Sequence, residues 1–149
     1  MNYTLSKDWT PEQHAEVQRA LVEYRVQLRV SGHPYSATFE RDFEFAAHSV
    51  ASGAICGVIV SSYLVLYVVS PLWCSPQPVF IEQLLMRLSE RPAGSFAEVQ
   101  ECMSALASEH GCSAIVVGNA YLRPGLTRRY NAAGYVHSNM ELMKEMPNG

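Results

Sequence analysis

The alternation of strand and helix patterns in the C-terminal half is the feature that most constrains how this chain can fold. Short apolar runs at Val79–Met86 and Ser113–Val117 predict two strands, and apolar side chains repeat at helical spacing from Phe96 to Leu106 between them. A short helix and a last strand are predicted to follow, at Leu126–Ala133 and Tyr135–Glu145. Two strands joined through a helix usually run parallel, so we expect an α/β fold with a mixed sheet that has at least one parallel pair and is flanked by helices.

The N-terminal half adds a strand, two helices and a strand pair. A short strand is expected at Asn2–Ser6. Thr10, Pro11 and Gln13 form a helix start with a capping box, because the Thr side chain and the Gln side chain satisfy backbone N–H groups that the helix itself leaves open. Ser31-Gly32 is predicted to end that helix. A second, short helix is predicted at Phe39–Ser49, and strands at Ala54–Val60 and Tyr63–Ser70.

The longest apolar stretch, Ala54–Val69, does not predict a membrane helix. Gly57 and the pair Ser61-Ser62 interrupt it, and it falls short of the roughly 20 residues that span a bilayer. The first nine residues are polar and mixed, unlike a secretory signal. We therefore expect one domain covering residues 1–149, located in the cytoplasm, with no membrane partner.

Charge and cysteine content exclude several classes of function. The formal net charge is −3, so no global positive field draws the chain to nucleic acid. The four cysteines form no C-x-x-C pair, and no histidine stands at metal-ligand spacing from them. We expect free thiols in a reducing compartment and no bound metal, although a Cys102–Cys112 disulfide stays open as an alternative.

The segment from Arg91 to Phe96, R-P-A-G-S-F, stands between the predicted strand and the next predicted helix. Small residues there would let the backbone approach a diphosphate, and the free N–H groups and positive dipole at the helix start would bind it. Ser95 and Glu98 form the expected capping box of that helix. An ordinary capped helix start explains the same residues equally well.

From Val79 to Glu145 the chain resembles the second half of the GNAT N-acetyltransferase superfamily. Arg91 and Gly94 match the R/Q-x-x-G-x-G/A loop that binds acetyl-CoA in that family, whereas Phe96 stands where the family has Gly or Ala. The most specific likeness is Tyr130, four residues before Gly134-Tyr135, as in the short fourth helix of the family. The resemblance implies a GNAT-like acyl-CoA N-acyltransferase fold, with a central, mixed, mostly antiparallel sheet flanked by helices.

The resemblance also implies residue roles. Tyr130 corresponds to the acid that protonates the departing thiolate, and its ordinary pKa of about 10 keeps the phenol protonated at neutral pH. Glu82, in the middle of an apolar strand, is the candidate base; a solvent-facing or Arg-paired carboxylate is the alternative. A core-packing Tyr130 is likewise an alternative. The candidate cofactor-binding residues are Arg87, Arg91, Ala93, Gly94, Ser95, Asn119 and Arg129.

Two functions follow from these residues. The first is direct acetyl transfer from acetyl-CoA, as a co-substrate, to an unknown small-molecule or protein amine, without a metal. The second is a catalytically inactive GNAT-fold protein that binds a partner or builds a structure, for example a component of a phage particle, in which case the location would be the virion. A homo-oligomer or a larger assembly fits either function. The retained Tyr130 and Arg91-x-x-Gly94 favour the first function, whereas Phe96 and the long Asn119–Tyr130 segment favour the second. Of the two, we expect the acetyltransferase.

Overall fold

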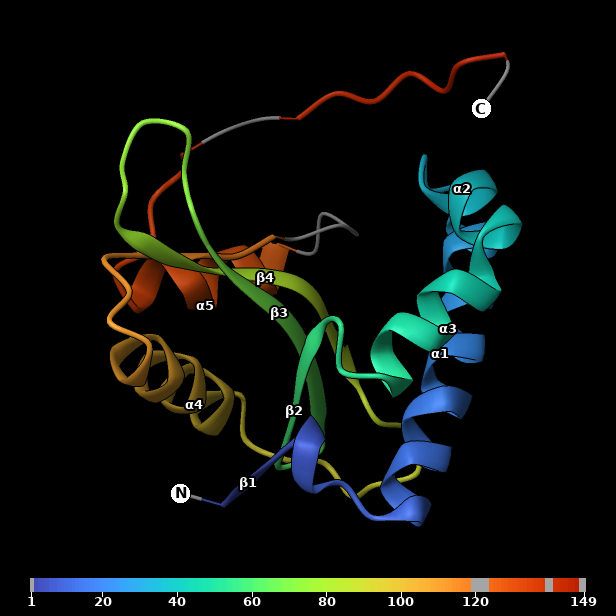
Figure 1. Cartoon of the computed structure of the whole chain (residues 1–149), viewed down its shortest axis with the longest axis horizontal. Coiled ribbons are helices and arrows are strands. Elements are labelled where there is room, and N and C mark those ends of the chain that lie inside the picture. Colours follow the sequence, from blue (N-terminus) through green and yellow to red (C-terminus); the bar gives the residue numbers. More distant parts are fainter. Residues whose placement is uncertain (1, 119–123, 139–140, 148–149) are drawn as a thin grey trace.

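A five-stranded sheet forms the centre of the computed structural model, which describes residues 2–118, 124–138 and 141–147 (Figure 1). The strands are β1 (Tyr3–Leu5), β2 (Cys56–Val60), β3 (Tyr63–Pro71), β4 (Pro78–Arg87) and β5 (Ile115–Val116), and they lie side by side in that order. All neighbours are antiparallel except β4 and β5, which are parallel. The predicted mixed, mostly antiparallel sheet is therefore confirmed.

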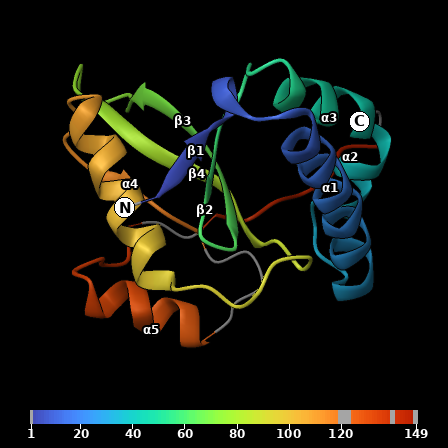
Figure 2. The same cartoon turned by 90° about the horizontal axis from the view of Figure 1, so that it is seen from below.

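Helices cover the two faces of this sheet (Figures 1 and 2). One layer holds α1 (Pro11–Ser31), α2 (Ser36–Arg41) and α3 (Phe43–Ala51), and the other holds α4 (Phe96–Glu109) and α5 (Pro124–Ala132). A short 3-10 helix, η1 (Ser6–Asp8), joins β1 to α1. The crossover from β4 through α4 to β5 joins a parallel pair, as the strand–helix–strand pattern of the sequence predicts.

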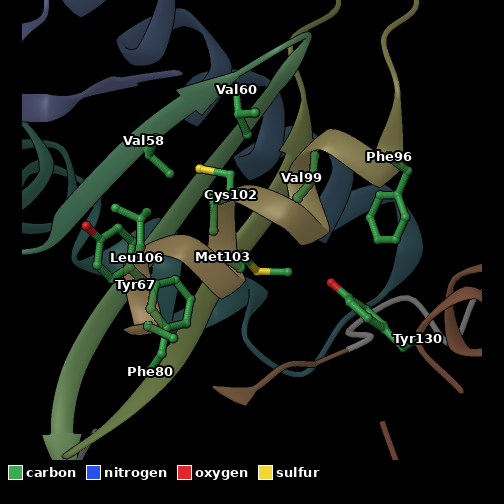
Figure 3. Packing of buried hydrophobic residues seen from close by; sticks show 12 residues of the cluster. Val58, Val60, Tyr67, Phe80, Phe96, Val99, Cys102, Met103, Leu106 and Tyr130 are labelled. Atoms are coloured by element: carbon green, nitrogen blue, oxygen red, sulfur yellow. The ribbon is translucent and has the colours of Figure 1, made fainter. Parts of the chain in front are cut away.

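The alternation of side chains along the strands separates two cores. Val58 and Val60 of β2 point into the core under α4 and α5, and Ile59 between them points into the core under α1 and α3. The α4 side is filled by Phe80, Val99, Met103 and Leu106, none more than 1% exposed (Figure 3). The site described below lies on this side.

The start and end of α1 are as predicted. The Thr10 hydroxyl accepts a hydrogen bond from the Gln13 backbone N–H at 3.2 Å, and the Gln13 side chain accepts one from the Thr10 N–H at 2.9 Å. At the other end, Gly32 adopts a left-handed conformation with φ of 65°. A residue without a side chain takes that conformation without strain, so the sequence marks both helix ends correctly.

The predicted capping box of Ser95 and Glu98 is wrong. Ser95 is the N-cap residue of α4, but its side chain accepts no hydrogen bond from the first turn. Its backbone N–H instead donates to the Ser61 hydroxyl at 3.3 Å, in the turn between β2 and β3. A tertiary contact has therefore replaced the local one that the pattern predicted.

The predicted helix Phe39–Ser49 is two helices. Asp42 lies between α2 and α3 with φ of −110° and ψ of 25°, outside the helical region. Arg41 donates two hydrogen bonds to the Asp42 carboxylate, at 2.9 and 3.1 Å, which supports the break. Short polar side chains favour such local contacts over a continuous helix.

The predicted last strand, Tyr135–Glu145, is also wrong over the part that the structure describes. Residues 135–138 and 141–145 lie in no strand, and the side chains of Val136 and Leu142 are 85% and 92% exposed. A segment with an alternating pattern forms a strand only where the edge of a sheet offers backbone groups for its hydrogen bonds. The nearest edge, β5, is two residues long, which is shorter than most strands in proteins.

A search of the described residues finds no helix with the length and apolar character needed to cross a membrane.

Candidate functional site

The site begins where β4 and β5 separate. Their parallel pairing covers Phe80 with Ile115 and Ile81 with Val116, and then stops. Just beyond this last pair, one residue along β4 and two residues after Val116, the Gly118 N–H donates a hydrogen bond to Oε2 of Glu82 at 3.0 Å. The side chain of Glu82 therefore bridges the two strands at the point where their backbone pairing ends.

A β-bulge lies at the same place in β4. Tyr67 of β3 is opposite Glu82 and Leu66 is opposite Leu84, so Gln83 has no partner residue in β3. A bulge turns the strand locally and changes which side chains point to each face. Before the bulge, Glu82 shares its face with Phe80, whose ring lies in the core under α4 and α5.

Burial changes the acidity of Glu82. Removal from water raises the pKa of this carboxyl to about 7, and the hydrogen bond from Gly118, which favours the charged form, opposes that rise only in part. A carboxyl group with a pKa near neutrality can both take up and release a proton at physiological pH. Glu82 thus has the acidity expected of a general base.

Tyr130 of α5 packs into the core on the same face of the sheet as Phe80. Its side chain is 4% exposed, and its ring meets those of Phe96 and Tyr135 edge-on, with centroids 5.5 and 5.0 Å apart. Its hydroxyl is buried and has no hydrogen-bond partner within the described part of the chain. Figure 3 shows the hydroxyl directed inward, toward the cluster that contains Met103.

The phenol of Tyr130 stays protonated at neutral pH. Burial raises its pKa well above the ordinary value, and the negative charge of Glu82 raises it further. The electrostatic influence of Glu82 shows that the two side chains act on each other, although no hydrogen bond joins them. The structure therefore brings the two predicted catalytic residues to one side of the sheet, and Tyr130 is part of the hydrophobic core there, as the core-packing alternative predicts.

The loop before α4 is held by contacts within the protein. Nε and Nη2 of Arg91 donate to the two carboxylate oxygens of Glu16 at 2.8 and 2.9 Å, and Nη1 donates to the Ser61 carbonyl at 3.2 Å. Gly94 lies so close to the β2–β3 turn that an added Cβ would be 2.0 Å from the Ser61 hydroxyl. The Arg91 guanidinium thus fixes the loop to α1 and to that turn.

Phe96 begins α4 and is itself part of the core. It is 7% exposed, and its ring contacts Tyr63 and Tyr130 edge-on. The guanidinium of Arg129 lies over the ring, 5.5 Å from its centroid. The aromatic side chain that departs from the family pattern therefore packs between Tyr63 of β3 and Tyr130 of α5.

Three other predicted cofactor-binding residues lie on the strand and the loop that precede α4 in the sequence. Arg87 is exposed at the end of β4, and Ala93 and Ser95 are exposed in the loop. Asn119 lies outside the described residues. A shallow cleft of about 480 Å³ opens nearby, between the outer face of α4 and the turn after α5. Its lining residues are Ala97, Gln100, Glu101, Ser104, Ala133 and Tyr135.

Sequence reasoning missed three residues that shape this region: Gly118, Ser61 and Glu16. Each contacts a predicted site residue only through tertiary structure, and the Glu16–Arg91 pair joins residues 75 positions apart. The one available signal was the Ser61-Ser62 turn, where Ser61 has a positive φ of 55°. Within the described residues, no group of three or more His, Cys, Asp or Glu side chains is arranged to hold a metal ion.

Comparisons with known proteins find similarity in structure only. No family model matches the sequence, and no curated protein matches it either. A crystal structure of a protein described as a probable acetyltransferase is 13% identical, with a TM-score of 0.66 over 99% of this chain and 97% of that one. The ribosomal-protein-alanine N-acetyltransferase of Brucella melitensis biovar Abortus 2308 is 11% identical, with a TM-score of 0.65 over 98% and 100%.

An aminoglycoside N-acetyltransferase solved in complex with CoA is 10% identical, with a TM-score of 0.59 over 97% of this chain and 98% of that one. These similarities extend over whole chains and include the crossover from β4 to β5. The protein therefore has the fold of the GNAT acetyltransferases, at a sequence identity that marks it as divergent.

Proposed function

We propose that this protein transfers an acetyl group from acetyl-CoA directly to the amine of an acceptor. The observation that carries the proposal is the buried, unpartnered hydroxyl of Tyr130 on the side of the sheet where β4 and β5 separate. Leaving such a donor unsatisfied costs about 1–3 kcal/mol. A bound molecule that supplies the missing acceptor atom would explain why the hydroxyl is retained. The solved structures of similar fold, which include a CoA complex, support the same choice.

The residues have distinct parts in this proposal. The thioester supplies the activated acetyl group. Tyr130, protonated at neutral pH, gives a proton to the leaving sulfur, and Glu82, whose pKa is about 7, takes the proton that the amine loses. No covalent intermediate on the protein is needed, since the amine attacks the carbonyl itself.

The start of α4 is the proposed place for the phosphates. The backbone of Ala93, Gly94 and Ser95 precedes a helix N-terminus, which favours anions, and the guanidinium of Arg129 lies over the ring of Phe96 in its first turn. Arg87 at the end of β4 is a further proposed contact. Asn119 remains a proposed contact from the sequence. Arg91 is bound to Glu16, so we assign it to holding the loop in position.

A second candidate is a GNAT-fold protein without catalysis, serving as a binding or structural component, for example of a phage particle. The burial of Phe96 between β3 and α5 favours it, because that ring fills space beside Tyr130. The commitment of the Ser95 N–H to Ser61 favours it too, because this donor would otherwise face an anion.

Binding of acetyl-CoA separates the two candidates. At about 100 times its dissociation constant the cofactor should add ~2.7 kcal/mol to the free energy of unfolding, measured as a rise in melting temperature. Acceptors are then screened with a panel of amines by the release of free CoA thiol. A melting temperature unchanged at millimolar acetyl-CoA would contradict the enzymatic proposal and favour the second candidate.

The role of Tyr130 is tested with Tyr130→Phe. We expect this variant to keep the acetyl-CoA-dependent rise in melting temperature and to lose about 10²–10⁴-fold in turnover, the range that acid–base catalysis contributes. Tyr135→Phe is the matched control, because it removes a hydroxyl from the neighbouring ring and should keep turnover. Equal turnover in wild type and Tyr130→Phe would remove Tyr130 from the mechanism.

A further inference from the structure

The outer face of α1 carries a second pattern that neither the core nor the proposed site uses. Val22 and Val26 are 47% and 42% exposed, and Val30 at the end of the helix is 81% exposed. Ala15, Arg19 and Arg29 are exposed on the same stripe. The spacing along this stripe alternates between four and three residues, as along the contact seam of paired helices. The residues are Ala15, Arg19, Val22, Val26 and Arg29.

This stripe is distinct from the face that α1 buries. Val17, Leu21 and Leu28 are at most 2% exposed and pack toward the sheet. Single exposed valines are common, but a line of them at seam spacing along a helix of 21 residues, about 30 Å long, is the pattern of a helix that pairs on its outer face. In Figure 1, α1 belongs to the helical layer on the side of the sheet away from α4 and α5.

The charges along the stripe decide how a partner helix would lie. Glu12 is exposed near the start, Arg19 near the middle and Arg29 near the end. A parallel pair of identical helices would place each of these charges beside its own copy, which is unfavourable. An antiparallel pair whose two-fold axis passes between Ala20 and Leu21 places Glu12 opposite Arg29 of the partner subunit.

The same register matches the apolar residues. Ala15 then faces Val26 of the partner subunit, and Arg19 faces Val22 of the partner subunit. A shift of one heptad in one direction would place Arg19 opposite Arg29 of the partner subunit. A shift in the other direction would carry Val26 beyond the start of the partner's helix, which begins at Pro11. One register alone combines opposite charges at both ends with apolar contact between them.

The ion pairs already present are compatible with this arrangement. Arg19 binds Glu90 of its own chain at 2.8 Å, so its charge is compensated while its alkyl stem is available to cover a valine. Arg29 lies 3.6 Å from Glu40, and its side chain is still 58% exposed. Arg29 can therefore contact a second carboxylate without leaving the first.

We propose that two copies of this protein associate through α1, antiparallel, with Val22 packed on the Arg19 stem at the centre of the contact, Val26 packed on Ala15 to either side, and Glu12–Arg29 pairs at its two ends. The contact is isologous, so each residue pair occurs twice and the assembly closes as a dimer. This surface is independent of the proposed acetyl transfer, and its test does not depend on activity.

The test is analytical ultracentrifugation of the full chain with paired charge reversals. Wild type should sediment as a dimer at 100–200 µM, and E12R and R29E should each raise the dissociation constant by about tenfold or more, because each reversal turns two attractions into two repulsions. An equimolar mixture of E12R and R29E should restore a one-to-one heterodimer, in which opposite charges face each other again. This rescue requires the antiparallel register.

Val26→Glu provides a second measure, and it should shift the protein to monomer. Val136→Glu, at an exposed valine away from α1, is the matched control and should leave the dimer intact. Melting curves establish that each variant is folded before its association is compared with that of wild type. The proposal is overturned by a wild type that stays monomeric at 200 µM, by dimers that persist in E12R, R29E and Val26→Glu, or by a mixture of E12R and R29E that remains monomeric.

Discussion

At the scale of single residues, Glu82 links the fold to the proposed chemistry. Its carboxylate closes the gap between β4 and β5 through the Gly118 N–H, and it acts electrostatically on Tyr130. A neutral Glu82 can still accept the Gly118 hydrogen bond, whereas its ionised form must remain in a poorly hydrated place. The ionisation of this one group should therefore be visible in the stability of the whole protein.

We predict that Glu82 lowers stability as the pH rises from about 4.5 to 7. The pKa of Glu82 is about 7 in the folded protein against 4.5 when exposed, so in this interval the unfolded chain binds fewer protons than the folded one. The contribution of the neutral form is complete below pH 4.5 and is lost as the pH passes 7. The loss is roughly 3 kcal/mol, taken from the size of the pKa shift.

Urea unfolding of wild type and Glu82→Gln between pH 4 and 8 measures this effect. The glutamine cannot ionise and keeps an oxygen for Gly118, so the variant should become the more stable protein above pH 7. Below pH 4.5 the two curves should differ by a constant amount, which serves as the internal reference. Parallel curves over the whole range would show that Glu82 is hydrated in solution.

At the scale of elements, the loop before α4 is packed directly against the β2–β3 turn, and this contact holds the predicted cofactor-binding segment against the sheet. An added Cβ on Gly94 would lie 2.0 and 2.6 Å from the hydroxyls of Ser61 and Ser62, and 2.9 Å from the Ser62 backbone nitrogen. The two hydroxyls could rotate, but the backbone nitrogen cannot. The glycine that resembles a cofactor-binding residue thus also has a packing reason to be glycine.

Gly94→Ala should therefore destabilise the fold by about 1–3 kcal/mol, the usual cost of overpacking. The measurement is the free energy of unfolding in urea at pH 7. Gly125→Ala is the control: Gly125 lies in α5, its added Cβ would meet nothing within 4 Å, and helix propensity predicts a gain of about 0.5–1 kcal/mol. If Gly94→Ala is as stable as wild type, the loop is not packed against the turn in solution.

The two helix starts show which features a sequence can predict. The cap of α1 was predictable because Thr10 and Gln13 satisfy each other's backbone within four residues. The same motif at Ser95 and Glu98 failed because the Ser95 N–H found Ser61, 34 positions away in sequence. Strand patterns placed β2, β3 and β4 correctly, since their apolar runs must be buried whatever their neighbours are.

In the candidate site, too, the features that depend on nearby residues were predictable and the contacts between distant residues were not. Glu82 and Tyr130 could be selected because a carboxylate in an apolar strand and a tyrosine before Gly134 stand out locally. Their contacts with Gly118 and Phe96 depend on which strands pair and which helix covers them. The contact between Arg91 and Glu16 could not be predicted, because a guanidinium suits a phosphate and a carboxylate equally well.

At the scale of the whole molecule, none of the described residues after Tyr135 belongs to either hydrophobic core. Residues 136–138 and 141–147 are exposed, and the segment runs from α5 across to the side of α2 (Figure 1). An exposed ion pair between Glu145 and Arg41, 3.8 Å apart, ties it there, and such pairs contribute about 0–1 kcal/mol. Tyr135, just before the segment, belongs instead to the core, with its ring 5.0 Å from that of Tyr130.

Removing residues 136–149 should therefore change the free energy of unfolding by less than about 1 kcal/mol, since little buried surface is lost. A deletion that also removes Tyr135 should cost about 2 kcal/mol more, because it takes away a half-buried aromatic ring and its contact with Tyr130. Urea unfolding of the two truncated chains beside the full chain measures both differences. A loss above about 2 kcal/mol on removing residues 136–149 alone would mean that this segment joins the edge of β5 in solution, as its alternating sequence pattern predicts. In that case the sheet would have a sixth strand, and the side of the site next to β5 would be covered.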